Sequence, residues 1–163
     1  MKRKQKGFSL IELLIVVAII LVIAAVAIPN LLRSRMSANE ASAIASMRSV
    51  ITSEIVYSMT YPIGFSSSLP SLGDGGAPAN CVPPALPAAG SACLIDASLA
   101  SGTKSGYLFT YAVAGGGGLN SSFTLNADPI FSGVSGQRHF FTDDTNVLRV
   151  NPVAAASVSD PAL

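Results

Sequence analysis

Residues 6–28 read KGFSLIELLIVVAIILVIAAVAI. The last 21 of these, residues 8–28, contain only two clearly polar side chains, Ser9 and Glu12. A helix needs about 20 apolar residues to cross the ~30 Å hydrocarbon layer of a bilayer. The stretch 8–28 is therefore predicted to be a transmembrane helix, and its one acidic residue needs an explanation.

The charges before this stretch set its orientation. Lys2, Arg3, Lys4 and Lys6 precede the apolar run, and no acidic residue stands among them. The positive-inside rule keeps such an end in the cytoplasm, so the chain from Pro29 onward is expected outside the inner membrane. Without these four residues, six basic side chains remain against nine acidic ones. The chain after these four residues has no cluster of basic side chains, so contact with nucleic acid is not predicted.

Two ordinary interpretations leave Glu12 without a role. A secretory signal peptide could be cut after Ala25-Val26-Ala27, but its apolar run is normally only 7–15 residues long. A plain single-pass anchor fits the length. Neither explains an acidic residue near the start, because a charged side chain in hydrocarbon costs about 2.5–3.5 kcal/mol on insertion scales. A charge in that position indicates a function.

The combination of a short basic leader, Gly7, Phe8 and Glu12 resembles the type III signal of type IV pilins and type II secretion pseudopilins. The resemblance implies that a prepilin peptidase cuts between Gly7 and Phe8 on the cytoplasmic side and N-methylates Phe8. The leader would then be residues 1–7. Glu12 would become the fifth residue of the mature chain, and the membrane helix would be retained.

The same resemblance implies a role for Glu12 in assembly. Cleavage creates a cation at the Phe8 amino group, and Glu12 of one subunit would neutralise the Phe8 amine of its neighbour. Pairing in a low-dielectric helix bundle offsets the cost that each charge carries alone. The partners implied are further copies of the chain, related minor pilins, the prepilin peptidase, and an inner-membrane assembly platform with its ATPase.

After the apolar run, residues 29–61 are predicted to form an amphipathic second half of the helix. Pro29 should kink or locally melt it, because proline removes a backbone hydrogen bond. Apolar residues recur at helical spacing and predict the face that packs on the rest of the chain. This stripe comprises Ile44, Met47, Ile51, Ile55 and Met59, widened by Ala41 and Val50, with Arg48, Thr52 and Glu54 off its centre.

Residues 62–103 are rich in Pro, Gly, Ser and Ala and are expected to form an irregular connection, with short helical turns allowed near residues 97–100. The only two cysteines, Cys81 and Cys93, lie in this segment. An oxidising periplasm favours a disulfide between them, which would contribute about 3 kcal/mol by the loop-entropy model. A metal site would need more ligands, and the single histidine, His139, is distant in sequence.

The remaining chain predicts an antiparallel sheet over residues 104–151, followed by a tail at 152–163. Four strands joined by short hairpins would pack on the helix, which makes the fold class α+β and pilin-like. They are expected at residues 106–113, 122–127, 138–142 and 147–150. Segments 104–111 and 136–150 also resemble those of pilin-type head domains, more weakly than the N-terminal motif does.

No catalytic constellation is recognisable, so the chain is predicted not to be an enzyme and to need no cofactor or metal. Glycines 115–118 are interpreted as a hairpin turn, because no Gly-Lys-Ser/Thr follows them. Asp143 and Asp144 could contact calcium, but a tight turn is favoured. His139 is interpreted as a strand residue.

Two filament types fit these features. The favoured hypothesis is a structural subunit of a type IV pilus, serving adhesion, twitching motility or DNA uptake. The alternative is a type II secretion pseudopilin that forms a periplasmic piston. Major pseudopilins typically carry a calcium-binding loop and an Asp-Ala-Trp-Gly-like stretch, and this chain has no tryptophan. The expected location is the inner membrane before assembly, and a pilus or a periplasmic or cell-surface filament afterwards.

Overall fold

A computed structural model describes residues 7–163, so the predicted basic leader, apart from Gly7, lies outside the described residues. The chain divides into two compact units, residues 1–35 and residues 36–163. Helix α1 (Leu10–Thr60) begins in the first unit and ends in the second. The two units are described separately below.

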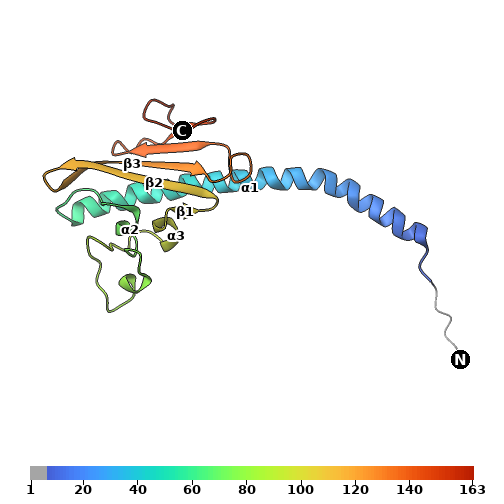
Figure 1. The fold of residues 1–163 in the computed structure, drawn as a ribbon, viewed down its shortest axis with the longest axis horizontal. Helices are drawn as coiled ribbons and strands as arrows, with labels where there is room; N and C mark the ends of the chain where they lie inside the picture. The colour runs from blue at the N-terminus through green and yellow to red at the C-terminus, as the bar shows by residue number, and fades with distance from the viewer. Residues whose placement is uncertain (1–6) are drawn as a thin grey trace. The chain divides into compact units, whose positions relative to one another are not determined.

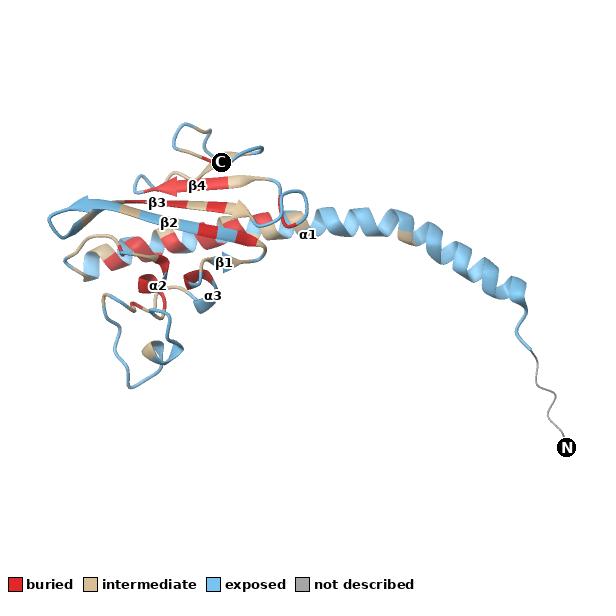
Figure 2. Cartoon of the chain, viewed as in Figure 1, coloured by how far each residue is buried: buried red, intermediate tan, exposed pale blue. Residues whose placement is uncertain are grey.

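In the first unit, the described residues form the start of α1 and little else (Figure 1). Every side chain from Gly7 to Arg35 is exposed except that of Ala24, which is half-buried (Figure 2). Among the described residues, α1 is the one helix that is long and apolar enough to cross a membrane. Pro29 lies inside α1, and the helix continues through it. The predicted kink at Pro29 stays a prediction.

The second unit contains the rest of α1 and an antiparallel sheet (Figure 1). Its five strands are hydrogen-bonded in sequence order, which is the predicted meander with one short strand added at its edge. The strands are β1 (Thr103–Lys104), β2 (Tyr107–Gly116), β3 (Leu119–Pro129), β4 (His139–Asp143) and β5 (Arg149–Asn151). The α+β fold class predicted from the sequence is thereby confirmed.

Strands β2 and β3 form the longest hairpin. Tyr107 and Phe109 on β2 are buried, and Leu108 between them is exposed, as expected when one face of a sheet packs on the core. The register shifts between Ala114 and Gly115, and a Cβ at Gly115 would collide with the carbonyl oxygen of Leu119. Glycines 115–118 thus serve the hairpin, as predicted.

The face of α1 that packs in the second unit differs from the predicted one. Ile55 and Met59 of the predicted stripe are exposed, whereas Glu54, expected off its centre, is fully buried. The buried side chains are those of Glu40, Ala43, Ser46, Met47, Val50, Ser53, Glu54 and Tyr57. The prediction is confirmed for Met47 and Val50, which are in the core, and is wrong for Ile55, Met59 and Glu54. It failed there because hydrophobicity alone assigns acidic residues to the surface, whereas the Glu54 carboxylate has hydrogen-bond donors in the core.

Three short helices precede the sheet, within the segment predicted to be irregular. They are α2 (Leu69–Leu72), the 3-10 helix η1 (Pro78–Cys81) and α3 (Ala97–Ala100), the last at the position where a helical turn was allowed. Leu72 and Leu99 from these helices join the core with the buried residues of α1 and the sheet.

The segment predicted to be a tail folds back along β5. The backbone amide of Val150 donates to the carbonyl of Pro161, and that of Leu163 donates to Leu148. Asp160 accepts hydrogen bonds from the backbone amide of Ser157 at 2.7 Å and from the Asn151 side chain at 2.9 Å. Residues 152–163 are therefore attached to the sheet.

Candidate functional site

The candidate site at the start of α1 contains Gly7, Phe8 and Glu12. Gly7 precedes the helix and has open space around it, since an added Cβ would meet nothing within 4 Å. The Phe8 side chain is 77% exposed. Glu12 Oε2 accepts a hydrogen bond from the backbone amide of Ser9 at 2.9 Å. This hydrogen bond is one of the two that make up a capping box: the side chain of the third helical residue, Glu12, accepts from the backbone amide of the N-cap residue, Ser9.

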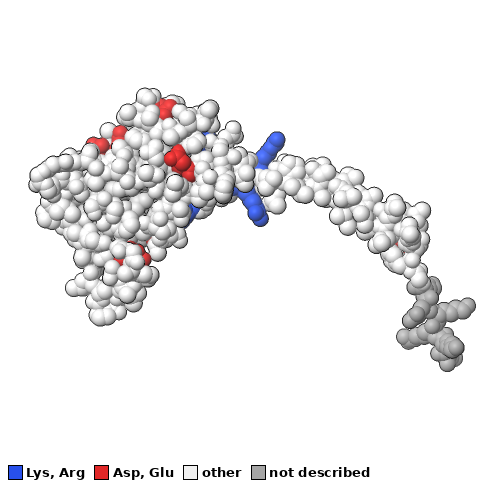
Figure 3. Space-filling view, viewed as in Figure 1, with Lys and Arg blue, Asp and Glu red and all other residues white. Residues whose placement is uncertain are grey.

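Glu12 therefore contacts its own helix start in the single chain. Its carboxylate has no ion pair with any residue from 7 to 163. Beyond it, the next charged residue along α1 is Arg33, and Figure 3 shows the helix surface between them as a long uncharged stretch. The site combines an exposed apolar helix, an accessible Gly7–Phe8 bond and one acid without a cation among the described residues.

The second acidic residue of α1, Glu40, is held by the loop between β3 and β4. Its carboxylate accepts hydrogen bonds from the backbone amides of Gln137 and Arg138 at 3.0 and 3.2 Å, and from Arg138 Nε at 2.7 Å. Burial raises the pKa of Glu40, but these hydrogen bonds and the Arg138 charge outweigh it and hold the pKa below its ordinary value. Asn39 adds a side-chain bond to the Ser135 carbonyl at 2.8 Å.

The third acidic residue, Glu54, is held by neutral donors only. Its carboxylate accepts hydrogen bonds from the Ser66 amide at 2.9 Å, and from the Ser66 and Tyr111 hydroxyls at 2.6 Å each. Burial and the hydrogen bond to Glu54 raise the pKa of Tyr111 well above its ordinary value. The carboxylate thus joins α1 to the loop after it and to β2.

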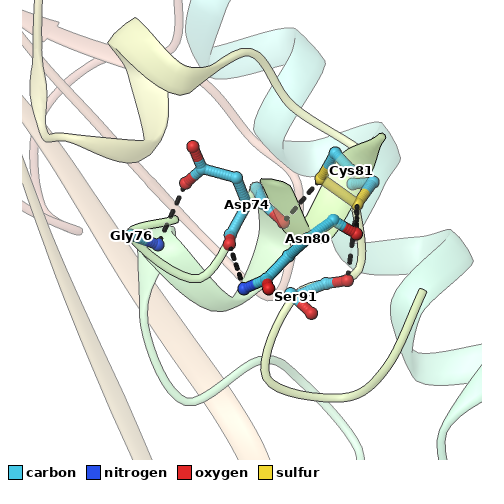
Figure 4. Close-up of a disulfide and its surroundings, with 7 residues drawn as sticks. Asp74, Gly76, Asn80, Cys81 and Ser91 are labelled. Carbon is cyan, nitrogen blue, oxygen red and sulfur yellow. Dashed lines mark hydrogen bonds between the residues drawn. A yellow bond between two sulfur atoms is a disulfide. The ribbon is translucent and has the colours of Figure 1, made fainter. Parts of the chain in front are cut away.

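The predicted disulfide between Cys81 and Cys93 is confirmed. Figure 4 shows the turn that precedes it, in which Asp74 accepts from the Gly76 amide at 3.0 Å and from Asn80 Nδ2 at 2.8 Å. On the far side of the loop, the hydroxyl of Tyr57 donates to the Ala89 carbonyl at 2.7 Å. The covalent loop is thereby tied to the buried face of α1.

The other residues considered from the sequence have local partners. Asp143 accepts hydrogen bonds from the amide and hydroxyl of Thr145, which is the side-chain pattern of a tight turn. His139 lies at the start of β4, with Nδ1 2.6 Å from Asp128 Oδ1. Among residues 7–163, no group of three potential metal ligands is found.

Glu40 and Glu54 were missed as structural residues by the sequence analysis. A usable signal existed: both stand at helical spacing in line with Ala43, Met47 and Val50. Acidic residues in line with an apolar stripe indicate buried carboxylates that have partners elsewhere in the chain. Those partners lie 12 to 98 residues away and cannot be located from a single sequence.

Comparison with known proteins supports the class that this geometry defines. A family profile described as the prokaryotic N-terminal methylation motif matches residues 2–28. That range contains Gly7, Phe8 and Glu12 and the whole apolar run, residues 8–28. With its long N-terminal helix and small antiparallel sheet, the chain has a pilin-like α+β fold and carries the prepilin-type methylation motif.

One curated relative extends the likeness beyond the motif. The chain is 44% identical over 80 residues to the "Type IV wide pilus major component PilA4" of Thermus thermophilus. The match covers 48% of this chain and 61% of the relative, so the chain spans less than two thirds of the relative's length. No solved structure matches. The resemblance to the type IV pilin family is confirmed on the N-terminal motif and on this half of the chain.

Proposed function

We propose that this chain is a structural subunit of a type IV pilus, made as a membrane-held precursor and trimmed between Gly7 and Phe8. The observation that carries the proposal is the start of α1, where an exposed Gly7–Phe8 bond precedes Glu12 and an apolar helix exposed on every side. A helix that is apolar all round is suited to lipid first and to other helices afterwards. The 44% identity over 80 residues to a type IV pilus component supports the same role.

In this mechanism a prepilin peptidase removes residues 1–7 and N-methylates the new terminus at Phe8. The resulting amine is a cation, and Glu12 of an adjacent copy neutralises it as the helices pack. In the single chain the Glu12 carboxylate caps its own helix start through Ser9, so it is held at the end of the helix where that amine would appear. In a low-dielectric helix bundle, only the register that brings the two charges together offsets their desolvation cost, so assembly in that register is favoured.

Related minor pilins, an inner-membrane platform and an ATPase complete the proposed set of partners. The type II secretion pseudopilin remains the alternative function, because the N-terminal motif is shared by both systems. The relative from Thermus thermophilus is a pilus component, which favours the pilus. Deleting the gene and scoring surface fibres against the yield of secreted proteins distinguishes the two.

The direct test is the mass of the N-terminal peptide from sheared surface material, together with electron microscopy of the same sample. Long fibres whose subunits begin at N-methylated Phe8 are expected. Subunits that still begin at Met1, or that begin after Ala27, would contradict the proposal.

A matched pair of glycine variants separates processing from folding. Gly7→Ala introduces a methyl group into open space, so the fold should tolerate it, whereas the peptidase should cut it more slowly. Gly116→Ala is the control, because its Cβ also meets nothing within 4 Å and it lies in β2, far along the chain from the cleavage site. Only Gly7→Ala should accumulate uncut precursor.

A further inference from the structure

We propose that, before assembly, the hydrocarbon-spanning part of α1 is residues 13–32, and that Arg33 and Arg35 fix this depth by binding lipid phosphates of the outer leaflet of the inner membrane. The inference rests on the proposed membrane-held precursor. The span starts five residues later and ends four residues later than the apolar run 8–28 predicts, and Glu12 moves out of the hydrocarbon into the cytoplasmic headgroup layer.

The first argument is the position of the helix start. Helix α1 begins at Leu10, with Ser9 capped by Glu12. The first backbone amides of a helix have no partner within it, and in lipid every backbone polar group must be satisfied inside the protein. A span that began at Phe8 would put these amides and the Glu12 carboxylate in hydrocarbon. In the headgroup layer, water and lipid head groups satisfy both.

The second argument is the length of the uncharged interval. Between Glu12 and Arg33 lie 20 residues without a charged side chain. At 1.5 Å per residue they span about 30 Å, which is the hydrocarbon thickness of a typical bilayer. Leu31 and Leu32, which follow the predicted end of the span, are both about half exposed in the single chain. The interval does contain Pro29 and Asn30, close to its outer end, but neither carries a charge.

The third argument is the arrangement of the two arginines. Arg33 and Arg35 are exposed, and neither has an ion pair among the described residues. Residues two apart on a helix are separated by about 200° around its axis, so the two side chains leave it on opposite sides. Figure 3 shows basic side chains on both sides of the helix at the end of the uncharged stretch. A protein partner would contact one side, whereas lipid surrounds the helix.

The chemistry of arginine suits this position. The guanidinium group binds phosphate through two parallel hydrogen bonds and stays charged at any physiological pH. Both residues would lie within about 5 Å of the hydrocarbon edge, which is the depth of the headgroup layer. The resulting depth would hold the Gly7–Phe8 bond at the cytoplasmic edge of the headgroup layer, about 7.5 Å or more from the hydrocarbon, where a peptidase working at that face reaches it.

The test measures depth in the uncut full-length chain, without peptidase or filaments, so its outcome is independent of processing and assembly. The chain is reconstituted in vesicles of phosphatidylethanolamine and phosphatidylglycerol. Single cysteines are introduced at Ser9, Leu31 or Ser37, and a membrane-impermeant maleimide is supplied on both faces. Cys81 and Cys93 stay unreactive because they form the disulfide.

Ser9→Cys and Ser37→Cys should react at similar rates. Leu31→Cys should react at least about tenfold more slowly than either, because it lies in hydrocarbon. The combination Arg33→Ala and Arg35→Ala should lower the rate at Ser37→Cys by about threefold or more, since the helix can then slide inward. Arg48→Ala, an exposed arginine farther along α1, should leave this rate unchanged.

The identity of the ligand is tested with a second lipid. In vesicles of diglucosyl diacylglycerol, which contain no phosphate, the double arginine variant and the parent chain should react alike at Ser37→Cys. Fast labelling at Leu31→Cys with slow labelling at Ser9→Cys would restore the span 8–28 and overturn the proposal. An unchanged rate in the double arginine variant in phospholipid would also overturn it, and a variant effect that persists without phosphate would exclude lipid phosphate as the ligand.

Discussion

Helix α1 carries three acidic residues, and its two regions hold them in opposite ways. In the second unit, Glu40 and Glu54 are buried, and each carboxylate has at least three hydrogen bonds to the rest of the chain. In the first unit, Glu12 has one hydrogen bond, to the helix start itself. The difference separates acids that complete the fold of one subunit from an acid whose proposed partner belongs to another.

This contrast follows from the cost of burying a charge. A carboxylate removed from water is tolerated only when hydrogen bonds or a cation replace its hydration. Glu40 and Glu54 obtain these from loops and strands far along the sequence, so their environment is complete when the second unit folds. Glu12 has no such element near it among the described residues. If it is buried in a filament, the missing partner must arrive with assembly.

Replacing Glu12 with alanine should have the largest effect, and only on assembly. The filament yield should fall at least about tenfold, because breaking a buried ion pair from one side costs about 3–5 kcal/mol. Quantifying sheared fibres against total membrane-held subunit measures this. The unfolding of the second unit should be unchanged.

Ser9→Ala is the matched control, since it removes a neighbouring hydroxyl and keeps the amide that Glu12 binds. It should assemble like the parent chain. A normal yield of fibres from Glu12→Ala would contradict the proposed contrast with Glu40 and Glu54, because Glu12 would then need no partner from a second copy.

Replacing Glu54 with alanine should give the reverse pattern. The change leaves the Ser66 amide without its acceptor, while the Ser66 and Tyr111 hydroxyls keep only the Ser68 and Ser66 carbonyls, at 3.2 and 3.0 Å. A buried donor without a partner costs about 1–3 kcal/mol and each lost hydrogen bond to a charged group about 1.5–3 kcal/mol, so the second unit should lose about 2 kcal/mol or more of unfolding free energy. Denaturant titration of the detergent-solubilised chain, followed by near-UV circular dichroism, measures this loss.

The control for this loss is Thr52→Ala, on the exposed side of the same helix turn. Its hydroxyl contacts only the Arg48 carbonyl within α1, so the change should stay within about 0.5 kcal/mol. A Glu54→Ala chain as stable as this control would show that the buried carboxylate contributes nothing to the fold.

The sequence predicted the elements of the fold better than it predicted their contacts. The apolar run, the strand propensity of residues 106–113, the alternation in residues 122–127 and the cysteine pair are local signals, and the structure contains the helix, strands and disulfide they indicate. The buried face of α1 depends on distant partners, which is why Glu54 was placed off it and Ile55 on it. The attachment of residues 152–163 through Asp160 left no local pattern either.

For the start of α1, the sequence motif supplied nearly all of the candidate site. Gly7, Phe8 and Glu12 lie within six consecutive residues, so no tertiary structure is needed to bring them together. The structure adds the Glu12–Ser9 hydrogen bond and the exposure of every neighbouring side chain. Neither the sequence nor the structure of one chain contains a second copy, so the proposed pair between Glu12 and a neighbouring Phe8 amine is tested by experiment.

The smallest expected effect belongs to Glu40, and it should depend on pH. Its pKa is lowered in the folded chain, so its contribution to stability is present above the ordinary carboxyl value of about 4.3 and is lost as the pH falls through the lowered pKa. Arg138 is 43% exposed, so solvent screens part of the pair, and Glu40→Gln should cost about 1–2 kcal/mol at pH 7.

The measurement is the difference in unfolding free energy between the parent chain and Glu40→Gln from pH 7 to pH 3. The pKa values of Asp96 and Asp160 are also lowered, but both residues are present in both proteins, so their contributions cancel in the difference. The difference should be constant above about pH 5 and shrink below pH 4.3. Lys104→Met, which breaks the more exposed pair with Asp96, should cost no more than about 0.5 kcal/mol. A difference for Glu40→Gln that is flat with pH would mean that the carboxylate charge does not stabilise the loop, and the distinction from Glu12 would then rest on Glu54 alone.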